Sequence, residues 1–418
     1  MYQAPRGTQD ILPPDRSYWR YVTEQMHSVA ALYGLQQIDT PMFEETSLFV
    51  RGVGEGTDIV DKEMYSFQDK GGREITLRPE FTAGVMRAYI EHGMHVLPQP
   101  VKLYSIGPIF RFDRPAAGRY RQFHQFNIEI LGEIDPAVDF EVMSVAWTLL
   151  SHLGYRGLNF QVNSTGCPRC RPSYRAALVG YFGMHESRLN EVDRRRLAIN
   201  PLRLLDSKEE AIQPLLDAAP HSADYLCDEC ASHLAALRGY LDAQEMPHTI
   251  NFRLVRGLDY YTKTVFEVWA EGIGAQAAVC GGGRYDGLIE ELGGAPTPGI
   301  GFAMGIERVI MALRQQGIVP PALPAPRVQV SPLGQAARLP ALRLTTELRE
   351  NGIGALLAFG SRSLKSQLKS ADKAGIAYTL ILGDTELASG VVVVRDMVSS
   401  QQETVALDGV VDWLRARV

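Results

Sequence analysis

The sequence lacks an apolar stretch long enough to cross a membrane. No uninterrupted hydrophobic run approaches the ~18–20 residues that a spanning helix needs, although hydrophobic residues make up 45% of the 418 residues. The opening segment, MYQAPRGTQDILPPD, has neither the apolar core of a signal peptide nor the pattern of a transit peptide. We therefore expect a cytoplasmic protein with no membrane partner.

The sequence also lacks an excess of positive charge. Its net charge is -6, from 42 basic and 48 acidic residues, so the chain as a whole does not have the basic balance typical of nucleic-acid-binding proteins. Any contact with RNA must come from local basic patches. The length allows two or three domains, and a charged fraction of 22% is typical of a globular protein.

Cysteine is scarce, and four of the five cysteines form two CxxC pairs. In a reducing compartment, cysteines are more often thiols or metal ligands than disulfides. Cys167, Cys170, Cys227 and Cys230 could offer zinc four tetrahedral thiolates. The long separation between the pairs, residues 171–226, weakens this interpretation, and unliganded thiols or a redox pair remain alternatives. Four cysteines leave no open position for catalysis, so we predict a structural zinc ion.

The usual phosphate-binding loops are missing. Gly281-Gly-Gly-Arg-Tyr-Asp-Gly287 is followed by no Gly-Lys-Ser/Thr and does not match Rossmann spacing. Its three glycines, which we expect to break a strand that starts at 275, would still let a backbone lie close to a ligand. Cys280 before them is expected in the core.

A predicted hairpin from Gly107 to Gly132 carries most of the candidate chemistry. Alternation along its second strand places Phe126, Ile128 and Ile130 on one face, as core. The opposite face and the loop carry mixed chemistry: Arg111, Arg114, Arg119, Arg121, Phe123, Gln125 and Glu129. Guanidinium groups suit phosphate and carboxylate oxygens. We therefore favour a site for an anionic ligand over a solvated, charged hairpin.

Further candidates lie where strands end. Glu80 and Thr82 follow a predicted strand, with Pro79 expected in the first helical turn; they either point into a cleft or cap that helix. Arg308 falls in the first turn of a helix after strand 299–305, where a cation opposes the helix dipole. It serves either a ligand or a salt bridge.

The segment Asn251 to Tyr261, NFRLVRGLDYY, is predicted to be strand-like. Arg256 precedes Gly257, a position where the backbone can turn. Because successive strand residues face opposite ways, only one of Tyr260 and Tyr261 is expected to enter a cleft fully.

The pattern divides the chain into five segments. Strand-rich regions at 1–164 and 248–317 flank a mostly helical inserted module at 165–247, which a proline-rich linker at 318–326 and an α/β unit at 327–418 follow. Alternating strands and helices in the last unit predict a mostly parallel sheet. One helix there carries a basic stripe, Arg362, Lys365, Lys369 and Lys373, which is either solvated surface or a footprint for a phosphate backbone.

Several motifs together resemble one family. The strand ending at Pro41, the arginine hairpin and the strand–helix arginine at 308 follow the order of the three motifs of class II aminoacyl-tRNA synthetases. Leu254-Val-Arg-Gly-Leu-Asp-Tyr-Tyr261 and the segment 281–287 resemble signatures of the histidyl-tRNA synthetases, and segment 361–373 resembles their anticodon-binding domain. The similarity covers essentially the whole chain.

The resemblance implies a fold and a reaction. The fold would be an α+β catalytic domain with an antiparallel sheet flanked by helices, a mostly helical insertion and a C-terminal α/β anticodon-binding domain. The protein would be a homodimer, with the strand near Pro41 at its interface. It would activate L-histidine with ATP and Mg²⁺ and transfer it to tRNA(His).

The resemblance also implies residue roles. Glu80 and Gln125, with Thr82 nearby, would hold the α-amino group of histidine. Glu129 and Tyr261 would contact the imidazole, with Tyr260 beside them. The catalytic pair Arg111 and Arg256 would flank the reacting carboxylate and α-phosphate. Phe123 and Arg308 would lie on either side of the adenine of ATP. Arg119 and Arg121 would contact the outer phosphates of ATP or the tRNA acceptor end. Predicted tRNA contacts are Arg114, Arg362, Lys365 and Lys369.

The chain departs from the family pattern in the hairpin loop. Ala116 and Ala117 stand where the family often has a glutamine near the first acceptor base pair, and the CxxC pairs are not general to the family. A non-catalytic paralogue, the regulatory subunit of ATP phosphoribosyltransferase, is the main alternative; it would lack the Arg256 signature and the C-terminal domain. A class II synthetase for glycine, threonine or proline is the other.

Overall fold

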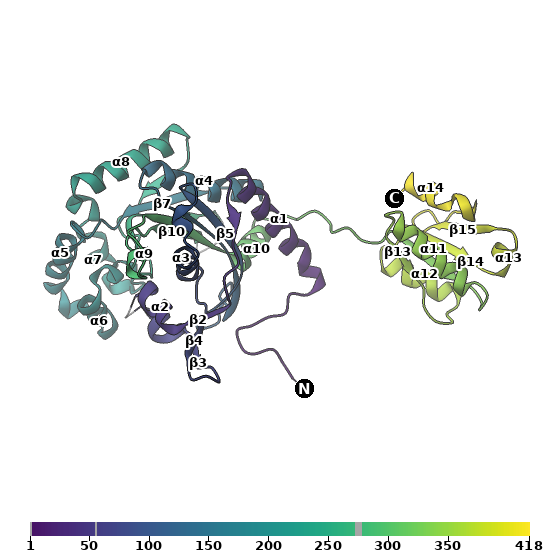
Figure 1. Cartoon of the computed structure of the whole chain (residues 1–418), viewed down its shortest axis with the longest axis horizontal. Helices are drawn as coiled ribbons and strands as arrows, with labels where there is room; N and C mark the ends of the chain where they lie inside the picture. Colours follow the sequence, from purple (N-terminus) through teal and green to yellow (C-terminus); the bar gives the residue numbers. More distant parts are fainter. Residues whose placement is uncertain (1, 55–56, 272–277) are drawn as a thin grey trace. The chain divides into compact units, whose positions relative to one another are not determined.

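The computed structural model describes residues 2–54, 57–271 and 278–418. The chain forms two compact units, Met1–Pro321 and Ala322–Val418 (Figure 1), and the boundary between them falls inside the proline-rich segment. The finer boundaries at 164, 247 and 317 stay predictions. No helix in the described part of the chain is long and apolar enough to span a membrane.

A central sheet organises the first unit. Among the described residues its strand order is β1-β5-β6-β11-β10-β9-β7-β8. The strands are β1 (Gln36–Gln37), β5 (Val101–Phe110), β6 (Gln122–Leu131), β7 (Asn159–Ser164), β8 (His248–Ile250), β9 (Thr262–Trp269), β10 (Ala278–Arg284) and β11 (Gly299–Gly305). The end pairs β1–β5 and β7–β8 are parallel, and the pairs between them are antiparallel. The implied antiparallel sheet is confirmed.

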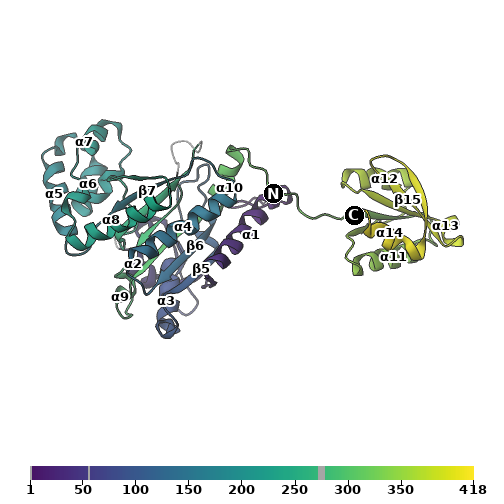
Figure 2. The ribbon, with the colours of Figure 1, turned by 90° about the horizontal axis from the view of Figure 1, so that it is seen from above.

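One face of this sheet is covered by helices. These are α1 (Arg16–Leu32), α4 (Pro136–His152), α8 (Asp228–Ala243) and α10 (Ile306–Gln315) (Figures 1 and 2). Phe126, Ile128 and Ile130 are at most 1% exposed within this core, so the predicted core face of the hairpin is confirmed. Each such buried side chain contributes on the order of 1.5–3 kcal/mol.

The other face of the sheet is only partly covered. Helices α3 (Thr82–Glu91) and α9 (Leu288–Glu291) pack over part of it and form a second core with Phe81, Leu103 and Ile109. The same unit contains a three-stranded sheet with the strand order β2 (Phe43–Glu45), β4 (Glu74–Leu77), β3 (Tyr65–Gln68). Helix α2 (Thr46–Val53) directly follows β2 in the chain. The part of this sheet face that no helix covers is available to bind a ligand.

Four local predictions were wrong. Pro41 does not end a strand but lies between β1 and β2, since proline lacks the N–H that a ladder uses. Pro79 precedes α3 by three residues rather than starting it. Gly281–Gly283 lie within β10, paired on both sides, instead of breaking it. Segment 251–261 forms turns and loop. Residues 275–277, the predicted start of the strand before the glycines, lie outside the described residues.

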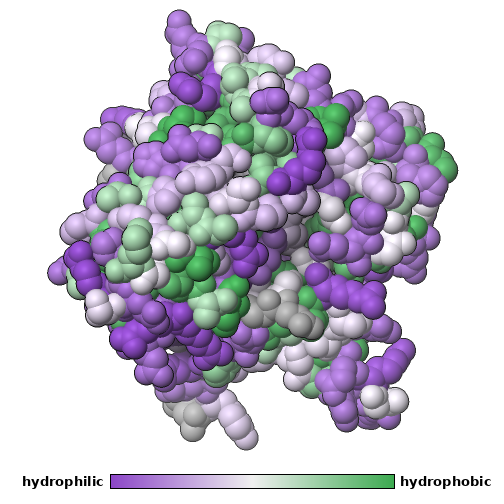
Figure 3. Space-filling model, turned by 90° about the vertical axis from the view of Figure 1, so that its left-hand side faces the viewer, coloured by the Kyte–Doolittle hydropathy of each residue, from purple (hydrophilic) through white to green (hydrophobic). Residues whose placement is uncertain are grey.

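The inserted region is mostly helical, as predicted. It contains α5 (Arg171–Gly183), α6 (Glu191–Ile199), η5 (Pro201–Asp206), α7 (Gln213–Asp217) and α8. Tyr174, Leu178 and Phe182 begin a small core of its own. Figure 3 shows mainly hydrophilic side chains on the end of the molecule that carries these helices, with hydrophobic ones in small scattered patches, because the apolar faces pack inward.

The second unit contains a five-stranded sheet in the order β13-β12-β14-β15-β16. Its strands are β12 (Val328–Pro332), β13 (Ala355–Leu357), β14 (Tyr378–Leu382), β15 (Val391–Asp396) and β16 (Gln402–Ala406), and its helices are α11 (Arg338–Glu350), α12 (Leu364–Lys373), α13 (Asp384–Ala388) and α14 (Val410–Arg415). The prediction of a mostly parallel sheet was wrong: β12 pairs parallel with β13 and β14, but the β14–β15 and β15–β16 pairs are antiparallel. No crossover helix separates β15 from β16, so a short connection makes that pair antiparallel.

Candidate functional site

A cavity of about 500 Å³ lies against the uncovered face of the central sheet. Most of the predicted histidine- and ATP-site residues line it: Glu80, Thr82, Arg111, Arg119, Phe123, Gln125, Arg256, Tyr260, Tyr261 and Arg308. They come from the loop between β5 and β6, from β6, from the residues at and just before the start of α3, from the 251–261 loop and from the start of α10. The chain therefore brings residues from across the first unit to one place.

Glu80 combines the two roles that its sequence position left open. Its carboxylate accepts hydrogen bonds from the backbone N–H groups of Thr82, at 2.6 Å, and Ala83, at 2.9 Å, so it satisfies the exposed donors at the start of α3. The residue is 4% exposed and still lines the cavity. Burial raises the pKa of Glu80, and the two backbone hydrogen bonds oppose that shift.

Gln125 has a polar atom in need of a partner. The residue is 8% exposed, and its Oε1 has no hydrogen-bond partner among the residues that the structure describes. An unpaired buried carbonyl costs roughly 1–3 kcal/mol. A ligand with an N–H donor, such as an ammonium group, would recover that energy.

Glu129 lies on β6 with the lining residues Gln125 and Asn127 but is itself outside the described cavity lining. It is 1% exposed and accepts hydrogen bonds from Asn127, at 3.0 Å, and from the hydroxyl of Tyr285. Burial raises the pKa of Glu129 to about 7, against the lowering effect of those donors. A carboxyl group with this pKa can gain or lose its proton near neutral pH.

Both tyrosines of the 251–261 segment line the cavity, which corrects the expectation that only one would enter it. Tyr260 and Tyr261 are each 8% exposed, with ring centroids 4.7 Å apart. The expectation assumed a strand, in which neighbours face opposite ways. In a turn, both side chains can point the same way.

Two cations line the cavity, Arg111 directly after β5 and Arg256 next to Gly281 of β10. Arg111 donates from Nε to the carbonyl of Pro79 at 2.8 Å and lies over the ring of Phe123, with Cζ 5.7 Å from its centroid. Arg256 pairs through Nη1 with Glu267, while its Nε has no partner among the described residues. Each guanidinium therefore has donors left for a ligand.

The glycine run explains how Arg256 fits. A Cβ on Gly281 would lie 2.6 Å from Nη1 of Arg256, closer than any real Cβ contact. Gly281 is therefore required for the guanidinium to lie flat against β10. The glycine strand therefore packs against the guanidinium of Arg256. It does not form a phosphate-binding loop, as glycine runs often do.

Phe123 and Arg308 offer an aromatic face and a guanidinium to the same cavity. Arg308 donates from Nη1 to the carbonyl of Ala278 at 3.2 Å, so it is anchored to β10. Arg119 is 3.2 Å from Asp113 and half exposed at the rim.

Two loop arginines lie outside the cavity lining. Arg121 packs over Phe112, with Cζ 3.9 Å from the ring centroid, and donates from Nε to the carbonyl of Asp113 at 3.3 Å. Arg114 is exposed. Ala116 and Arg119 close a tight turn through reciprocal backbone hydrogen bonds of 3.1 and 2.9 Å, with Gly118 at φ +71°. The roles of Arg114 and Arg121 stay predictions.

The sequence reasoning missed several lining residues. Asn127 shares the parity of Gln125, so alternation could have found it. Glu267, which holds Arg256, lies on β9 with no local motif to mark it. Arg196, Arg203 and Asp206 come from the inserted helices, and nothing in their local pattern shows that this region folds back to the cavity.

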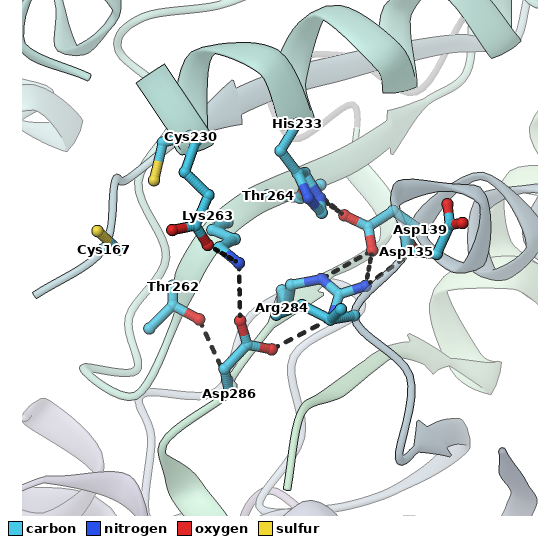
Figure 4. Close-up of polar contacts among 12 residues, drawn as sticks. Asp135, Asp139, Cys167, Cys230, His233, Thr262, Lys263, Thr264, Arg284 and Asp286 are labelled. Atoms are coloured by element: carbon cyan, nitrogen blue, oxygen red, sulfur yellow. Dashed lines mark hydrogen bonds and ion pairs between the residues drawn. The ribbon is translucent and has the colours of Figure 1, made fainter. Parts of the chain in front are cut away.

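Arg284, in the middle of the Gly281–Gly287 signature, serves the fold. It is fully buried and donates to Asp139 of α4 from Nε at 2.9 Å and from Nη2 at 2.5 Å. Asp139 also lies 2.6 Å from Nε2 of His233 (Figure 4). Burial opposes ionisation of Asp139, but His233 and Arg284 outweigh it and lower its pKa. This network ties β10 to α4 and α8.

Comparison with known proteins identifies the family. The family model described as "Histidyl-tRNA synthetase" matches residues 7–169 and 184–309, and the model described as "Anticodon binding domain" matches residues 327–417. The chain belongs to the histidyl-tRNA synthetase family. The class II synthetase resemblance is thereby confirmed.

Relatives within the histidyl-tRNA synthetase family match over the full chain. A protein named histidine–tRNA ligase from Dehalococcoides mccartyi is 51% identical over 418 residues, covering 100% of both chains. One of the same name from Pelotomaculum thermopropionicum is 50% identical, covering 99% of this chain and 97% of its own. The crystal structure of apo S. aureus histidyl-tRNA synthetase superposes with a TM-score of 0.84 at 39% identity, covering 99% of both chains. The regulatory paralogue has less support.

Proposed function

We propose that the chain is a histidine–tRNA ligase: it activates L-histidine with ATP and transfers it to the 3′ end of tRNA(His). One observation carries this most strongly. One cavity is lined by Arg111 and Arg256 together with a row of polar and acidic side chains on β6 and at the start of α3. The arginines suit two anions that must meet, and the polar row suits an amino acid with a polar side chain.

In the first step, a histidine carboxylate oxygen attacks the α-phosphorus of ATP. The new P–O bond forms as the bond to the β-phosphate oxygen breaks, and pyrophosphate leaves. The protein must bring two anions together and stabilise the charge on the transferring group. Arg111 and Arg256 are placed for this, and loss of one such donor costs about a hundred- to a thousandfold.

We assign recognition of histidine to the polar row. Glu80 and the unpaired Oε1 of Gln125 would accept hydrogen bonds from the α-ammonium group. Glu129 and Tyr261 would hold the imidazole by its two nitrogens. Sites built from buried polar partners reject analogues that lack the matching group by roughly 10⁴–10⁵-fold.

Phe123 and Arg308 would hold the adenine of ATP between them, and Arg119 would meet the outer phosphates. Arg121 would join them only if the hairpin loop moved, since its guanidinium packs on Phe112. Mg²⁺ would neutralise phosphate charge. The lining carboxylates of Glu63 and Asp113 offer the oxygen ligands that this ion prefers.

In the second step, a hydroxyl of the terminal ribose of tRNA attacks the acyl carbon and AMP leaves. We assign the proton to a phosphate oxygen of the adenylate. The exposed basic residues Lys365 and Lys369 on α12, with Arg362 just before that helix rather than on it as predicted, would contact the tRNA backbone. Arg114, exposed in the hairpin loop, would do so at the acceptor end.

We further propose that the protein works as a homodimer. The sheet segment that resembles the family's interface motif exposes apolar side chains: Met42 is 51% and Phe43 54% exposed, and Phe67, on β3 at the opposite edge of the same sheet, is 46% exposed. Exposed apolar clusters of this kind often mark a protein interface. Sedimentation analysis should give twice the 46.2 kDa chain mass, and a monomer at micromolar concentration would refute this part.

Charging of tRNA tests the function as a whole. The protein, ATP, Mg²⁺ and unfractionated tRNA should attach radiolabelled histidine to the tRNA, and adding unlabelled histidine should compete with the label. A protein that binds histidine but attaches none would be a regulatory paralogue.

A further inference from the structure

The four cysteines of the two CxxC pairs come together although the chain between the pairs is long. Their sulfur atoms all lie within 4.8 Å of one another. Cys167 Sγ is 3.8 Å from Cys170 Sγ and 3.8 Å from Cys227 Sγ, and Cys170 Sγ is 3.9 Å from Cys230 Sγ. These separations are far longer than the ~2.05 Å of a disulfide bond.

The geometry fits a tetrahedral metal centre. A Zn–S bond of about 2.3 Å places the sulfurs of a tetrahedral site about 3.8 Å apart, close to the separations observed. The backbone N–H of Cys167 donates to Cys170 Sγ at 3.2 Å, as it would to a thiolate. From this arrangement we propose that Cys167, Cys170, Cys227 and Cys230 bind one structural zinc ion.

The surroundings suit a closed and charged centre. Cys167, Cys170 and Cys230 are each at most 8% exposed. Four thiolates with one Zn²⁺ carry a net charge of −2, and a cation is at hand: Arg169 Nη2 lies 3.9 Å from Cys227 Sγ. Four protein ligands leave no position for substrate, so the zinc ion stabilises structure and takes no part in the reaction.

The centre joins the two ends of the inserted helices. One pair of cysteines directly precedes α5, and the other lies at the start of α8. The apolar contact between these ends is small: among the described residues, the cluster of the four cysteines adds Leu226 alone, and the ion pair of Arg169 with Glu229 lies beside it. Zinc binding would thus supply stabilisation that this small apolar cluster does not provide.

Polar contacts continue from the centre to the proposed histidine site. Arg171, next to Cys170, donates through Nη2 to the carbonyl oxygen of Tyr261 and through Nε to that of Thr165 at 3.2 Å. On the other side, Glu229 lies 3.0 Å from Lys263, which lies 3.5 Å from Asp286. Figure 4 shows the contact of Lys263 with Asp286 in the same view as Cys167 and Cys230. The backbone N–H of Lys263 also donates to the carbonyl oxygen of Gly166, next to Cys167, at 2.9 Å. The zinc centre therefore holds the backbone on either side of Thr262; its effect on histidine binding rests on the proposed function, but zinc binding itself does not.

Metal analysis of the full-length protein tests the site. After purification without chelators, mass spectrometry should find one zinc per chain, and the four thiols should react with a thiol reagent only as zinc is released. Cys230→Ser should lose the zinc. Cys280→Ser, which alters the fifth cysteine, should keep it.

Three results would overturn the zinc site: no metal with all four thiols reacting freely, iron in place of zinc, or the same zinc content in Cys230→Ser as in the unmodified protein. None of these depends on activity. A protein that holds zinc but activates no amino acid would instead refute the proposed function.

Arg171→Ala tests the link to the histidine site. Arg171 is a positioning residue, so the variant should keep its zinc and raise KM for histidine about tenfold, with KM for ATP changed less than about twofold. Arg171→Lys, which keeps one donor, should recover part of the loss. An unchanged histidine KM in a zinc-loaded Arg171→Ala variant would refute the positioning role.

Discussion

Arg256 is the residue on which the proposed chemistry depends most. Replacing it with histidine removes the guanidinium that faces the cavity between Glu267 and Gly281. We expect Arg256→His to bind histidine within a few-fold of the unmodified protein and to lose about a hundred- to a thousandfold of histidine-dependent pyrophosphate exchange. Calorimetry for binding and exchange for activation measure the two effects separately.

Gly281→Ala is an independent control on Arg256, because its new methyl group would displace the guanidinium without removing it. It should reduce exchange in the same direction. Wild-type exchange in Arg256→His would show that the catalytic assignment is wrong.

Glu129 predicts a pH dependence of histidine activation. Burial raises its pKa to about 7, so below pH 7 the free protein carries a neutral Glu129, which accepts hydrogen bonds less well than a carboxylate. We expect kcat/KM for histidine to fall as pH drops below 7. In Glu129→Gln, kcat/KM should be about 10–100-fold lower at pH 8, and this component of the pH profile should be absent.

The raised pKa of Glu129 also makes the stability of the folded protein depend on pH, in a direction that follows from the shift. Because the folded pKa is raised, the folded state favours the protonated form, and this contribution is lost as pH rises through about 7. Glu129→Gln, which stays neutral, should therefore melt at a higher temperature than the unmodified protein at pH 8 and at a similar one at pH 5. Equal melting temperatures at pH 8 would contradict the raised pKa.

At the scale of residues, the sequence predicted a side chain best where one strand fixed its direction. Alternation along β6 placed Phe123 and Gln125 on one face and Ile128 on the other, and the structure has this arrangement. Prediction failed where the backbone leaves regular structure: Tyr260 and Tyr261 share the cavity because they lie in a turn. Glu267 depends on pairing between distant strands, which local pattern does not encode.

The basic stripe on α12 makes a prediction at the scale of one element. Lys365 and Lys369 are exposed, and their reversal to glutamate would replace attraction to a phosphate backbone with repulsion. We expect Lys365→Glu/Lys369→Glu to reduce tRNA charging at least tenfold and to steepen its loss with added salt, while pyrophosphate exchange stays unchanged.

Arg343→Glu is a matched control for the stripe, since it reverses an exposed charge on α11. It should leave charging near its normal rate. Equal losses of charging and exchange in the double variant would mean that the stripe serves the fold.

Helices and strands with a clear hydrophobic periodicity were predictable. Features that depend on strand pairing or on a proline were not. Strand β6 of the predicted hairpin, strand β11 and helix α10 lie where their patterns indicate. The break at Pro41 and the antiparallel edge formed by β15 and β16 were missed. The direction of a strand depends on the length of its connection and on which strand it pairs with. The prediction of a mostly parallel sheet used only the alternation of strands and helices, so it could not find these antiparallel pairs.

At the scale of the whole molecule, the two compact units predict separable activities. The apolar cores of residues 1–321 and of residues 322–418 share no residues, so a fragment that ends at Pro321 should fold. It should retain histidine-dependent pyrophosphate exchange within about tenfold and lose most tRNA charging, because it lacks α12. A folded fragment, by circular dichroism, without exchange would place part of the activation site in the second unit.

Amino-acid-dependent pyrophosphate exchange tests the central claim most directly. The protein, Mg²⁺, ATP and labelled pyrophosphate are incubated with each amino acid in turn, without tRNA. The account predicts that label enters ATP with histidine and with no other amino acid. Exchange with glycine, threonine or proline, or no exchange with histidine by a protein that binds it, would contradict the account.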